Sequence, residues 1–392
     1  MKVSFKHTMY ACFTGYIVQA IVNNFVPLLF LTFQASYGIS ITKITFLVTF
    51  NFGLQLIIDL ISAGMIDRIG YRISVIAAHL FAAAGLIALV VLPEYFKEPF
   101  YGLLIAVMIY ALGGGLIEVL ISPIVEACPS DHKEAAMSLL HSFYCWGHVA
   151  VVLGSTLFFY VFGISNWRIL ALIWAAIPLI NALIFTKVPI APLIKEGERG
   201  LSIKELCFKP SFWLMVLLMI AAGASEQSVS QWASTLAEKS LGISKTLGDL
   251  TGPMLFAVMM GTARVVYSRK GASKHLGRNM IFNSGLCVVG YLLIGLAPWP
   301  IVNLVGCGIC GFAVGILWPG TFSTAAAKIK RGGTVLFALL ALAGDLGCAL
   351  GPTVVGRISD SAGENLKVGI LSAIVFPIIM LVGVNLLRRK ES

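Results

Sequence analysis

The fold is decided by the stretch Gln55–Leu92, QLIIDLISAGMIDRIGYRISVIAAHLFAAAGLIALVVL, in which a short charged turn separates two long apolar blocks. The same pattern continues through the 392 residues, of which 58% are hydrophobic and only 12% are charged. A soluble domain has about 25% charged residues, and its apolar residues come in short periodic runs. The composition therefore excludes most soluble enzymes and indicates that lipid surrounds most of the chain.

Twelve apolar blocks are long enough to cross a membrane as helices, which takes about 20 mostly apolar residues. Their centres lie near residues 22, 55, 83, 113, 148, 176, 223, 257, 287, 312, 346 and 376. The first block is longer than a signal-peptide core and has no small-residue cleavage site after it, so we expect it to be retained. The eight cysteines are scattered and lie mostly inside apolar blocks, which predicts small buried side chains rather than a disulfide framework.

The positive charges indicate the orientation in the membrane, because Lys and Arg are retained on the cytoplasmic face. Twelve spans put both termini on one side, and that side collects 21 of the 28 Lys and Arg residues. We therefore predict a multi-pass protein of the cytoplasmic (inner) membrane with both termini in the cytoplasm. The net charge of +10 is explained by this topology and requires no nucleic-acid partner.

The longest polar connection covers residues 188–209 and contains two prolines and a charged run. It predicts an N-terminal six-helix bundle over residues 1–187, a cytoplasmic linker over 188–209 and a C-terminal six-helix bundle over 210–392. Short matches at a shift near 200 residues support a duplication, with ALGGGL at 111–116 over GFAVGI at 311–316. Many secondary transporters are parallel duplications of this kind, with the substrate site at mid-membrane between the halves.

The charged turn Ala63–Arg72, AGMIDRIGYR, resembles the loop signature of the major facilitator superfamily, Gly-x-x-x-Asp-Arg-x-Gly-Arg-Arg. The first residue of the stretch and Tyr71 depart from the signature. The resemblance implies a gate in which Asp67 and Arg68 bridge to neighbouring helices when the cytoplasmic side is closed. Gly70 allows the sharp turn between two helix ends. An ordinary charged loop is the plainer interpretation.

The stretch Gly114–Val125, GGLIEVLISPIV, resembles the Gly-x-x-Glu-x-x-x-Asn-Pro-Phe-Val segment of the fucose and glucose/galactose permeases, which are proton symporters. Further similarity lies in AIVNNF at 20–25 and FNFG at 50–53. The resemblance implies an all-α membrane protein with twelve transmembrane helices in two six-helix bundles, the major facilitator fold. Those permeases carry an Asp a few residues after the Asn pair, where this chain has Val26 and Pro27, so coupling uses another group or a single carboxylate.

Carboxylates inside apolar blocks are candidates for proton coupling, because a charge at mid-membrane is costly. A carboxyl group in a low-dielectric cavity can load and release a proton near neutral pH, as symport requires. Three glycines just before Glu118 allow close helix approach. A buried structural hydrogen bond is the alternative for Glu118. Asp345 can pair with Arg264 or Lys328 across helices, or with neither. The predicted coupling residues are Glu118, Glu226 and Asp345.

Amide and aromatic side chains are candidates for binding the solute. In EQSVSQW at 226–232, Gln227, Ser230 and Gln231 share a helix face, and amides can donate to and accept from sugar hydroxyls at once. A polar seam between helices is the alternative. Helical spacing also relates His141, Tyr144 and His148, and histidines can titrate near neutral pH, so they are reserves for the missing coupling group. A Trp can stack on the apolar face of a sugar ring, but Trp is also common at membrane interfaces. The predicted solute-binding residues are Asn23, Asn24, Asn51, His141, Tyr144, Trp146, Gln227, Gln231, Trp232 and Trp318.

The segment GCGICG at 306–311 matches both a dinucleotide fingerprint and a Cys-x-x-Cys pair. Neither has the required context, because the segment lies inside an apolar block without a βαβ unit or further metal ligands. We expect its small residues to pack helices tightly. We therefore expect no cofactor or metal. The chain also contains no Walker-type phosphate loop, so we expect no ATP hydrolysis.

These observations predict a secondary active transporter rather than an enzyme. The favoured function is proton symport of a small polar solute, with a sugar as the expected class, through alternating access. A drug or metabolite/proton antiporter of the same fold is the alternative. The expected partners are a sugar-like small molecule, protons and the lipid bilayer, with no nucleic acid, and we expect the protein to act as a monomer.

Overall fold

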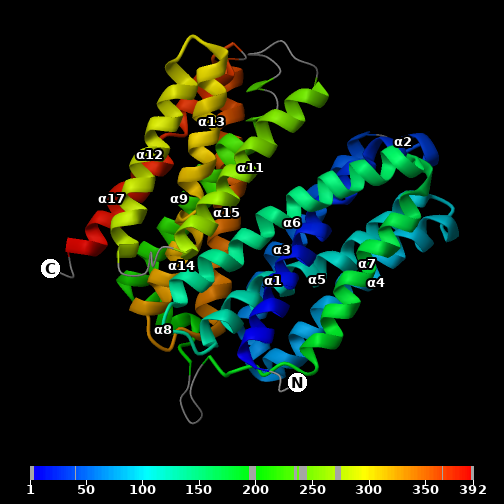
Figure 1. The fold of residues 1–392 in the computed structure, drawn as a ribbon, viewed down its shortest axis with the longest axis horizontal. Coiled ribbons are helices and arrows are strands. Elements are labelled where there is room, and N and C mark those ends of the chain that lie inside the picture. Colours follow the sequence, from blue (N-terminus) through cyan, green and yellow to red (C-terminus); the bar gives the residue numbers. More distant parts are fainter. Residues whose placement is uncertain are drawn as a thin grey trace. The chain divides into compact units, whose positions relative to one another are not determined.

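A computed structural model of the chain describes residues 4–39, 41–193, 200–233, 236, 237, 245–269, 275–363 and 365–389. Within these ranges the side chains at 31, 41, 42, 44, 45, 48, 49, 63, 64, 67, 245–251, 269, 360 and 389 are not described. All regular structure in the described ranges is helical, as Figure 1 shows. Ten helical spans there are long and apolar enough to cross a membrane, and every predicted apolar block falls on a long helical segment.

The spans are formed by the following helices. The first half contains α1 (Phe5–Asn24), η1 (Val26–Leu29), α2 (Phe30–Tyr37), α3 (Ile41–Ile69), α4 (Tyr71–Tyr95), α5 (Pro99–Ala127), α6 (Lys133–Phe162), η2 (Ile164–Asn166) and α7 (Trp167–Phe185). The second half contains α8 (Ile203–Cys207), α9 (Pro210–Ser230), α11 (Lys245–Arg269), α12 (Leu276–Leu296), α13 (Pro300–Val314), α14 (Leu317–Lys328), α15 (Gly333–Ser361), α16 (Leu366–Ser372) and α17 (Val375–Arg389).

Contacts between Cα atoms divide the chain into two compact units. Unit 1 consists of residues 1–129, 146–200 and 333–338, and unit 2 of residues 130–145, 201–332 and 339–392. The long helices α6 and α15 therefore each contribute residues to both units. The boundary between Gly200 and Leu201 falls inside the polar connection at 188–209.

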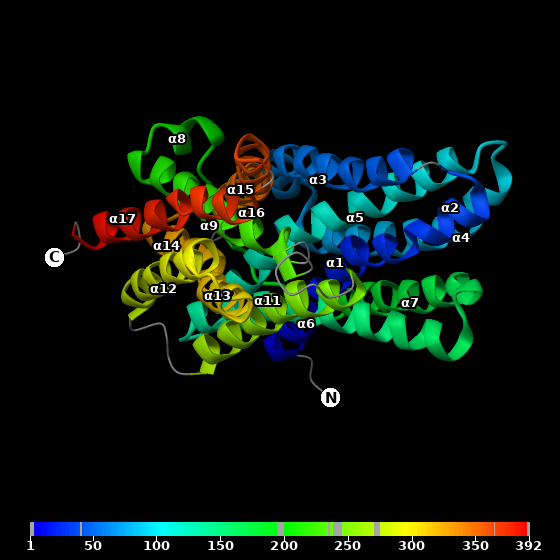
Figure 2. The same ribbon diagram turned by 90° about the horizontal axis from the view of Figure 1, so that it is seen from above.

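The two units repeat one packing pattern. In unit 1, α4 packs against α5 and α7, α3 packs against α5, and α1 packs against α5 and α7. In unit 2, α12 packs against α13 and α17, α11 against α13, and α9 against α13 and α17. Figures 1 and 2 show the pairs α4 with α7 and α12 with α13 running side by side in both views. The duplication visible in the sequence is thus also a duplication of helix contacts.

Glycines allow the central helices of each unit to approach closely. A Cβ atom on Gly113 of α5 would lie 2.5 Å from the backbone nitrogen of Ala82 in α4. In the GCGICG segment, a Cβ on Gly306 would meet the carbonyl oxygen of Gly290 at 3.0 Å, and one on Gly311 would meet Phe256 at 2.5 Å. The prediction that this segment packs helices is confirmed. None of the eight cysteines forms a disulfide, and six of them are buried.

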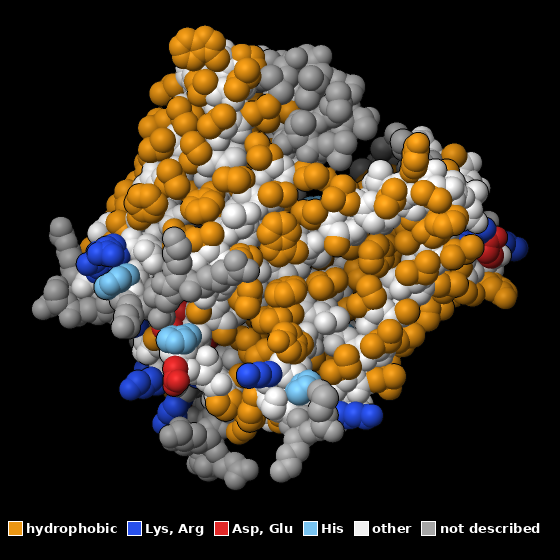
Figure 3. Space-filling view, in the orientation of Figure 1, with side chains coloured by type: hydrophobic (Ala, Val, Ile, Leu, Met, Phe, Trp, Pro, Cys, Tyr) orange, Lys and Arg blue, Asp and Glu red, His pale blue; other side chains and the backbone are white. Residues whose placement is uncertain are grey.

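The outer faces of the helices are apolar. Large side chains with more than half of their surface exposed include Tyr10, Ile73, Leu157, Leu183, Phe282 and Ile301. Figure 3 shows hydrophobic side chains covering most of the surface in view, with Lys, Arg, Asp, Glu and His side chains gathered at the lower left, the bottom and the right edge. Exposed apolar faces of this extent are expected of helices that contact lipid.

Two of the described spans are broken near a buried polar side chain, Asn23 in the first case and Arg264 in the second. After α1 ends at Asn24, the short 3-10 helix η1 contains Pro27, which has no amide hydrogen to continue the α-helical ladder. In the span Pro300–Lys328, α13 ends at Val314 and α14 begins at Leu317, so that Gly315 lies in the break. Broken helices free backbone groups at membrane depth, where other parts of the protein must satisfy them.

Gly113→Ala is expected to lower the thermal stability of the protein, because the new methyl group meets the backbone of α4 and forces the two helices apart. Overpacking of this kind costs about 1–3 kcal/mol. Gly53→Ala in α3 is the matched control, since a Cβ there meets no atom within 4 Å. Unfolding in detergent is followed by the reaction of the buried thiols with a fluorogenic maleimide. Equal unfolding temperatures for the two variants would contradict the close-contact interpretation.

Candidate functional site

Four amide side chains form a buried cluster in unit 1, which we call the amide cluster: Gln19 and Asn23 of α1, and Asn51 and Gln55 of α3. The Oδ1 atom of Asn23 accepts hydrogen bonds from Asn51 Nδ2 at 3.1 Å and from Gln55 Nε2 at 2.9 Å. Gln55 Nε2 also donates to Asn51 Oδ1 at 3.0 Å. All four side chains are at most 9% exposed. The amides therefore hold α1 and α3 together where lipid could not satisfy them.

Glu118 of α5 completes this site. Gln19 Nε2 donates a hydrogen bond to Glu118 Oε2 at 2.6 Å, whereas Gln19 Oε1 is buried and has no hydrogen-bond partner among the described residues. The helices can meet this closely because a Cβ on Gly114 of α5 would lie 3.1 Å from Val22 and 3.5 Å from Gln55. Nearby on the same two helices, the hydroxyls of Tyr16 and Ser122 share a hydrogen bond of 2.9 Å.

The structure thus brings together three residues predicted from the sequence, Glu118, Asn23 and Asn51. Sequence reasoning missed Gln19 and Gln55, although each lies four residues from a predicted Asn on the same helix. Asn24 points elsewhere, because its Nδ2 donates to the carbonyl of Ala20 in its own helix at 2.8 Å.

A buried ion pair lies in unit 2. Arg264 Nη2 of α11 is 3.5 Å from Glu226 Oε2 of α9, with side chains 5% and 14% exposed. The rest of the guanidinium is also bound: Nε donates to Gly315 O at 3.0 Å, and Nη1 donates to His141 O at 2.9 Å and lies 2.9 Å from Cys145 Sγ. The carboxylate that Arg264 meets in the structure is thus one of the predicted coupling residues, Glu226.

The helix break at Gly315 explains how Arg264 is held. A carbonyl at the end of α13 has lost its intrahelical donor, and a guanidinium, which is always charged and has five N–H donors, satisfies it. Removing one partner of a buried pair costs about 3–5 kcal/mol, because the remaining charge stays buried. Unit 2 is therefore expected to be destabilised by any substitution that removes the charge of Arg264 or of Glu226 alone.

Two predicted amides extend the ion pair along α9. Gln227 Nε2 donates to Glu226 Oε1 at 3.4 Å, and Gln231 Nε2 donates to Gln227 Oε1 at 3.1 Å. The shared face expected from helical spacing is therefore present. Gln231 is exposed, so the row leads from the buried carboxylate toward an accessible side chain.

Aromatic side chains in unit 2 form a second predicted group. The His141 ring stacks on Phe322 with centroids 5.9 Å apart, and Trp318 meets Phe322 edge-on at 6.2 Å. A Cβ on Gly344, next to the predicted coupling residue Asp345, would collide with the Trp318 ring at 2.2 Å. Trp318 and Asp345 are thus brought to neighbouring positions, which sequence spacing does not reveal.

The remaining predicted binding residues are not brought into these clusters by any described contact. Trp232 Nε1 donates to Pro352 O at 3.3 Å. Tyr144 belongs to unit 2 and is half-buried, whereas Trp146 belongs to unit 1 and is 36% exposed. Their assignment to solute binding stays a prediction.

The charged turn between α3 and α4 has a defined geometry. Gly70 has φ of +91° and its N–H donates to Ile66 O at 2.8 Å, so it ends α3 in a conformation that favours glycine. The side chain of Asp67 lies outside the described residues, and Arg68 is exposed. The turn predicted for Gly70 is confirmed, while the gating role of the three residues stays a prediction.

Two further residues of this turn have described partners. Arg72 donates to the carbonyls of Phe185, Thr186 and Val188 at 2.7, 3.1 and 2.9 Å, which caps the C-terminal end of α7. The hydroxyl of Tyr71, where the signature has a basic residue, is hydrogen-bonded to Thr334. The departure from the signature therefore replaces a charge by a neutral hydrogen bond.

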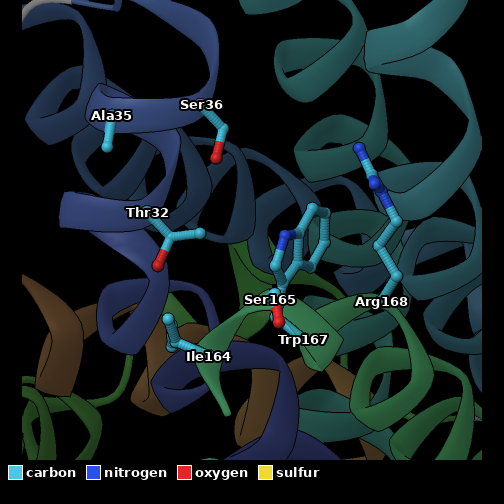
Figure 4. Close-up of a pocket in the computed structure, with 7 residues that line it drawn as sticks. All are labelled: Thr32, Ala35, Ser36, Ile164, Ser165, Trp167 and Arg168. Atoms are coloured by element: carbon cyan, nitrogen blue, oxygen red, sulfur yellow. The ribbon is translucent and has the colours of Figure 1, made fainter.

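A cavity of about 510 Å³ lies in unit 1 away from the amide cluster. Figure 4 shows its lining side chains, which come from α2, η2 and the start of α7: Thr32, Ala35, Ser36, Ile164, Ser165, Trp167 and Arg168. Arg168 also binds Glu94 and Tyr37. No residue of the predicted site lines this cavity, so we do not assign the solute to it.

Membrane-spanning helices in two repeated units, with an amide cluster and an ion pair buried inside them, define a multi-pass membrane transporter. The chain belongs to the major facilitator superfamily, because the family model described as Major Facilitator Superfamily matches residues 11–352. Proteins of this family and fold are transporters and not enzymes. No curated protein matches the chain.

Solved structures with the same fold include three transporters. The Escherichia coli fucose:proton symporter FucP has a TM-score of 0.82 at 16% identity, over 96% of this chain and 98% of its own. The proton:xylose symporter XylE, bound to 6-bromo-6-deoxy-D-glucose, has a TM-score of 0.83 at 14% identity, over 98% of this chain and 95% of its own. The human organic anion transporter MFSD10 has a TM-score of 0.75 at 16% identity, over 97% of this chain and 99% of its own. At these identities the similarity establishes the fold.

Glu226→Gln is expected to lower the unfolding temperature, because it leaves the Arg264 charge buried without its carboxylate. The loss is at most about 3–5 kcal/mol, since two carbonyl hydrogen bonds to Arg264 remain. Thermal unfolding of Glu226→Gln, Arg264→Met and the double variant gives the coupling energy of the pair.

The matched control is Glu94→Gln, which breaks an Arg–Glu pair whose side chains are 44% and 52% exposed. An exposed pair contributes about 0–1 kcal/mol, so this variant should keep nearly the parental stability. Strictly additive effects of Glu226→Gln and Arg264→Met would show that the buried pair is not an energetic unit.

Proposed function

We propose that the protein is a secondary active transporter that moves a sugar-like solute together with a proton by alternating access. The observation that carries this proposal is the Gln19–Glu118 hydrogen bond of 2.6 Å, beside an amide cluster buried inside membrane-spanning helices. A carboxyl group at membrane depth is costly and is a functional candidate by default. The similarity of fold to two sugar:proton symporters supports the same class.

Gln19 gives Glu118 a partner in both protonation states. When the carboxylate is charged, Gln19 Nε2 donates to it, as in the structure. When Glu118 is protonated, rotation of the amide presents Gln19 Oε1, which has no described hydrogen-bond partner, as an acceptor for the carboxyl proton. A single rotation of the Gln19 amide therefore keeps a hydrogen-bond partner for Glu118 in either protonation state.

The solute is recognised in this proposal by amide groups. Asn23, Asn51 and Gln55 present both donors and acceptors, and a sugar hydroxyl acts as donor and acceptor at once. Their mutual hydrogen bonds of 2.9–3.1 Å keep them satisfied without a solute. Gln227, Gln231 and the aromatic group of His141 and Trp318 are the corresponding candidates in unit 2, and Glu226 and Asp345 are its candidate coupling groups.

Glu226 has a different relation to charge from Glu118. It faces a fixed cation, so protonation of Glu226 would leave Arg264 with one uncompensated positive charge. This favours Glu118 as the proton carrier. Glu226 then serves as the counter-ion that neutralises Arg264.

A metabolite/proton antiporter is the second candidate, and the buried Arg264 favours an anionic metabolite for it. A carboxylate on the solute could replace Glu226 at the guanidinium, whose Nη2 has its described contact at the relatively long distance of 3.5 Å. The human organic anion transporter MFSD10 shares the fold. The two candidates differ in the charge of the solute and the direction of the driving gradient.

Glu118→Gln is expected to abolish proton-driven accumulation of the solute while counterflow exchange continues, because the amide is neutral and cannot release a proton. The assay measures uptake of labelled hexoses and deoxyhexoses into proteoliposomes, with and without an inward proton gradient. Glu94→Gln is the control, since it removes an exposed carboxylate of the same unit. It should accumulate solute as the parent does.

Two outcomes would contradict this proposal separately. Gradient-driven accumulation by Glu118→Gln at the parental level would exclude Glu118 as the coupling residue. Absence of uptake of every sugar under every gradient would exclude the sugar-like solute, and organic acids with an outward gradient would then be tested against Arg264→Met.

We also propose that the chain lies in the cytoplasmic membrane with both termini in the cytoplasm, from the distribution of Lys and Arg. Epitope tags fused at each end should resist protease added to intact spheroplasts and be cleaved after lysis. Cleavage of either tag in intact spheroplasts would contradict the proposed topology.

A further inference from the structure

A cationic cavity of about 530 Å³ lies in unit 2, where α12 begins and α14 and α17 end. Among the residues that the structure describes, Arg278, Lys328 and Arg388 line it, together with His275 and one carboxylate, Glu134. Three cationic side chains therefore converge with one anionic side chain. We call this space the α12 cavity. It contains none of the residues assigned to solute binding or proton coupling.

The start of α12 adds to the positive potential of the cavity. His275 occupies the N-cap position and its side chain makes no capping hydrogen bond, so the first-turn N–H groups keep the partial positive charge of a helix N-terminus. The Arg388 side chain lies against this turn, because a Cβ on Gly277 would be 3.3 Å from its Cγ and Cδ atoms. The helix terminus and a guanidinium stem are thus packed side by side.

A buried hydroxyl supplies a second, independent observation. Ser323 of α14 lines the cavity and is 6% exposed, and its Oγ has no hydrogen-bond partner among the described residues. Its neighbour Thr324 also lines the cavity, but its Oγ1 donates to Gly320 O of the same helix at 2.7 Å. Ser323 therefore retains an unused donor at the wall of a cationic space, where an anionic acceptor would satisfy it.

The surface next to the cavity indicates where such an anion would come from. Phe282 of α12, one turn beyond Arg278, is 64% exposed, and Val382 and Leu386 of α17 are 52% and 49% exposed. Helices α12 and α17 pack against each other, so these apolar side chains belong to the same pair of helices as the cavity. A molecule with an anionic head and an apolar tail matches this combination better than a free anion does.

We propose that the α12 cavity binds the phosphate of an anionic phospholipid headgroup, with Arg278 and Arg388 as its main ligands and the acyl chains along α12 and α17. Guanidinium groups and helix N-termini are both favourable partners for phosphate oxygens. Basic pockets between transmembrane helices are sites of this type. The cavity volume exceeds that of a phosphate ion and leaves room for the glycerol part of a headgroup.

The test measures thermal unfolding of the purified full chain in detergent during titration with phosphatidylglycerol, phosphatidylcholine or inorganic phosphate. Phosphatidylglycerol should raise the unfolding temperature at a concentration about tenfold lower than phosphatidylcholine, as two charge-assisted contacts predict. In Arg278→Gln/Arg388→Gln this preference should disappear. Lys187→Gln/Lys204→Gln removes the same charge from exposed residues outside the cavity and should keep the preference.

A second variant leaves all charges in place. Thr324→Leu fills the cavity with an apolar side chain, and it should weaken the effect of phosphatidylglycerol even if the double Arg variant folds poorly. Parental lipid preference in Thr324→Leu and in the double Arg variant would overturn the proposed site. Stabilisation by inorganic phosphate equal to that by phosphatidylglycerol would overturn the lipid as the source of the phosphate.

Discussion

Lipid offers a buried polar group no hydrogen-bond partner, and this constraint organises the whole molecule. It requires the spans to be helical, so that backbone groups bond within the chain. It also favours pairing of the polar side chains inside the spans with one another or with open backbone groups. In unit 1 the amides of α1 and α3 satisfy one another, and Gln19 satisfies Glu118. In unit 2 Arg264 satisfies both a carboxylate and the carbonyl left open at a helix break.

The two units keep the same helix contacts but have exchanged the chemistry inside them. The α1–α3–α5 side of unit 1 contains neutral amides and the carboxylates of Asp59 and Glu118, whereas the corresponding α9–α11–α13 side of unit 2 contains an ion pair. At the repeat shift of 200 residues, Trp318 stands where the first half has Glu118. A duplicated scaffold has thus retained its packing while one copy specialised in a titratable group and the other in a fixed charge and aromatic rings.

The sequence was sufficient for the spans, the repeat and the buried carboxylates, because these depend on local composition and on the cost of charge in lipid. It could not identify partners. Gln19 and Glu118 are 99 residues apart, and nothing in the periodicity of either helix indicates that they meet. The pairing of Arg264 with Glu226 depends on how α9 and α11 pack and on the break at Gly315, which is set by tertiary contacts.

The amide cluster also has a consequence for biosynthesis. The span that contains α1 has the lowest mean hydropathy of the ten described spans, since it carries Gln19 and Asn23. Their partners Asn51, Gln55 and Glu118 are synthesised later, so the first span leaves the ribosome with unsatisfied amides. We expect it to remain beside the translocon until α3 and α5 arrive, which makes membrane insertion of this half a cooperative event rather than a succession of independent spans.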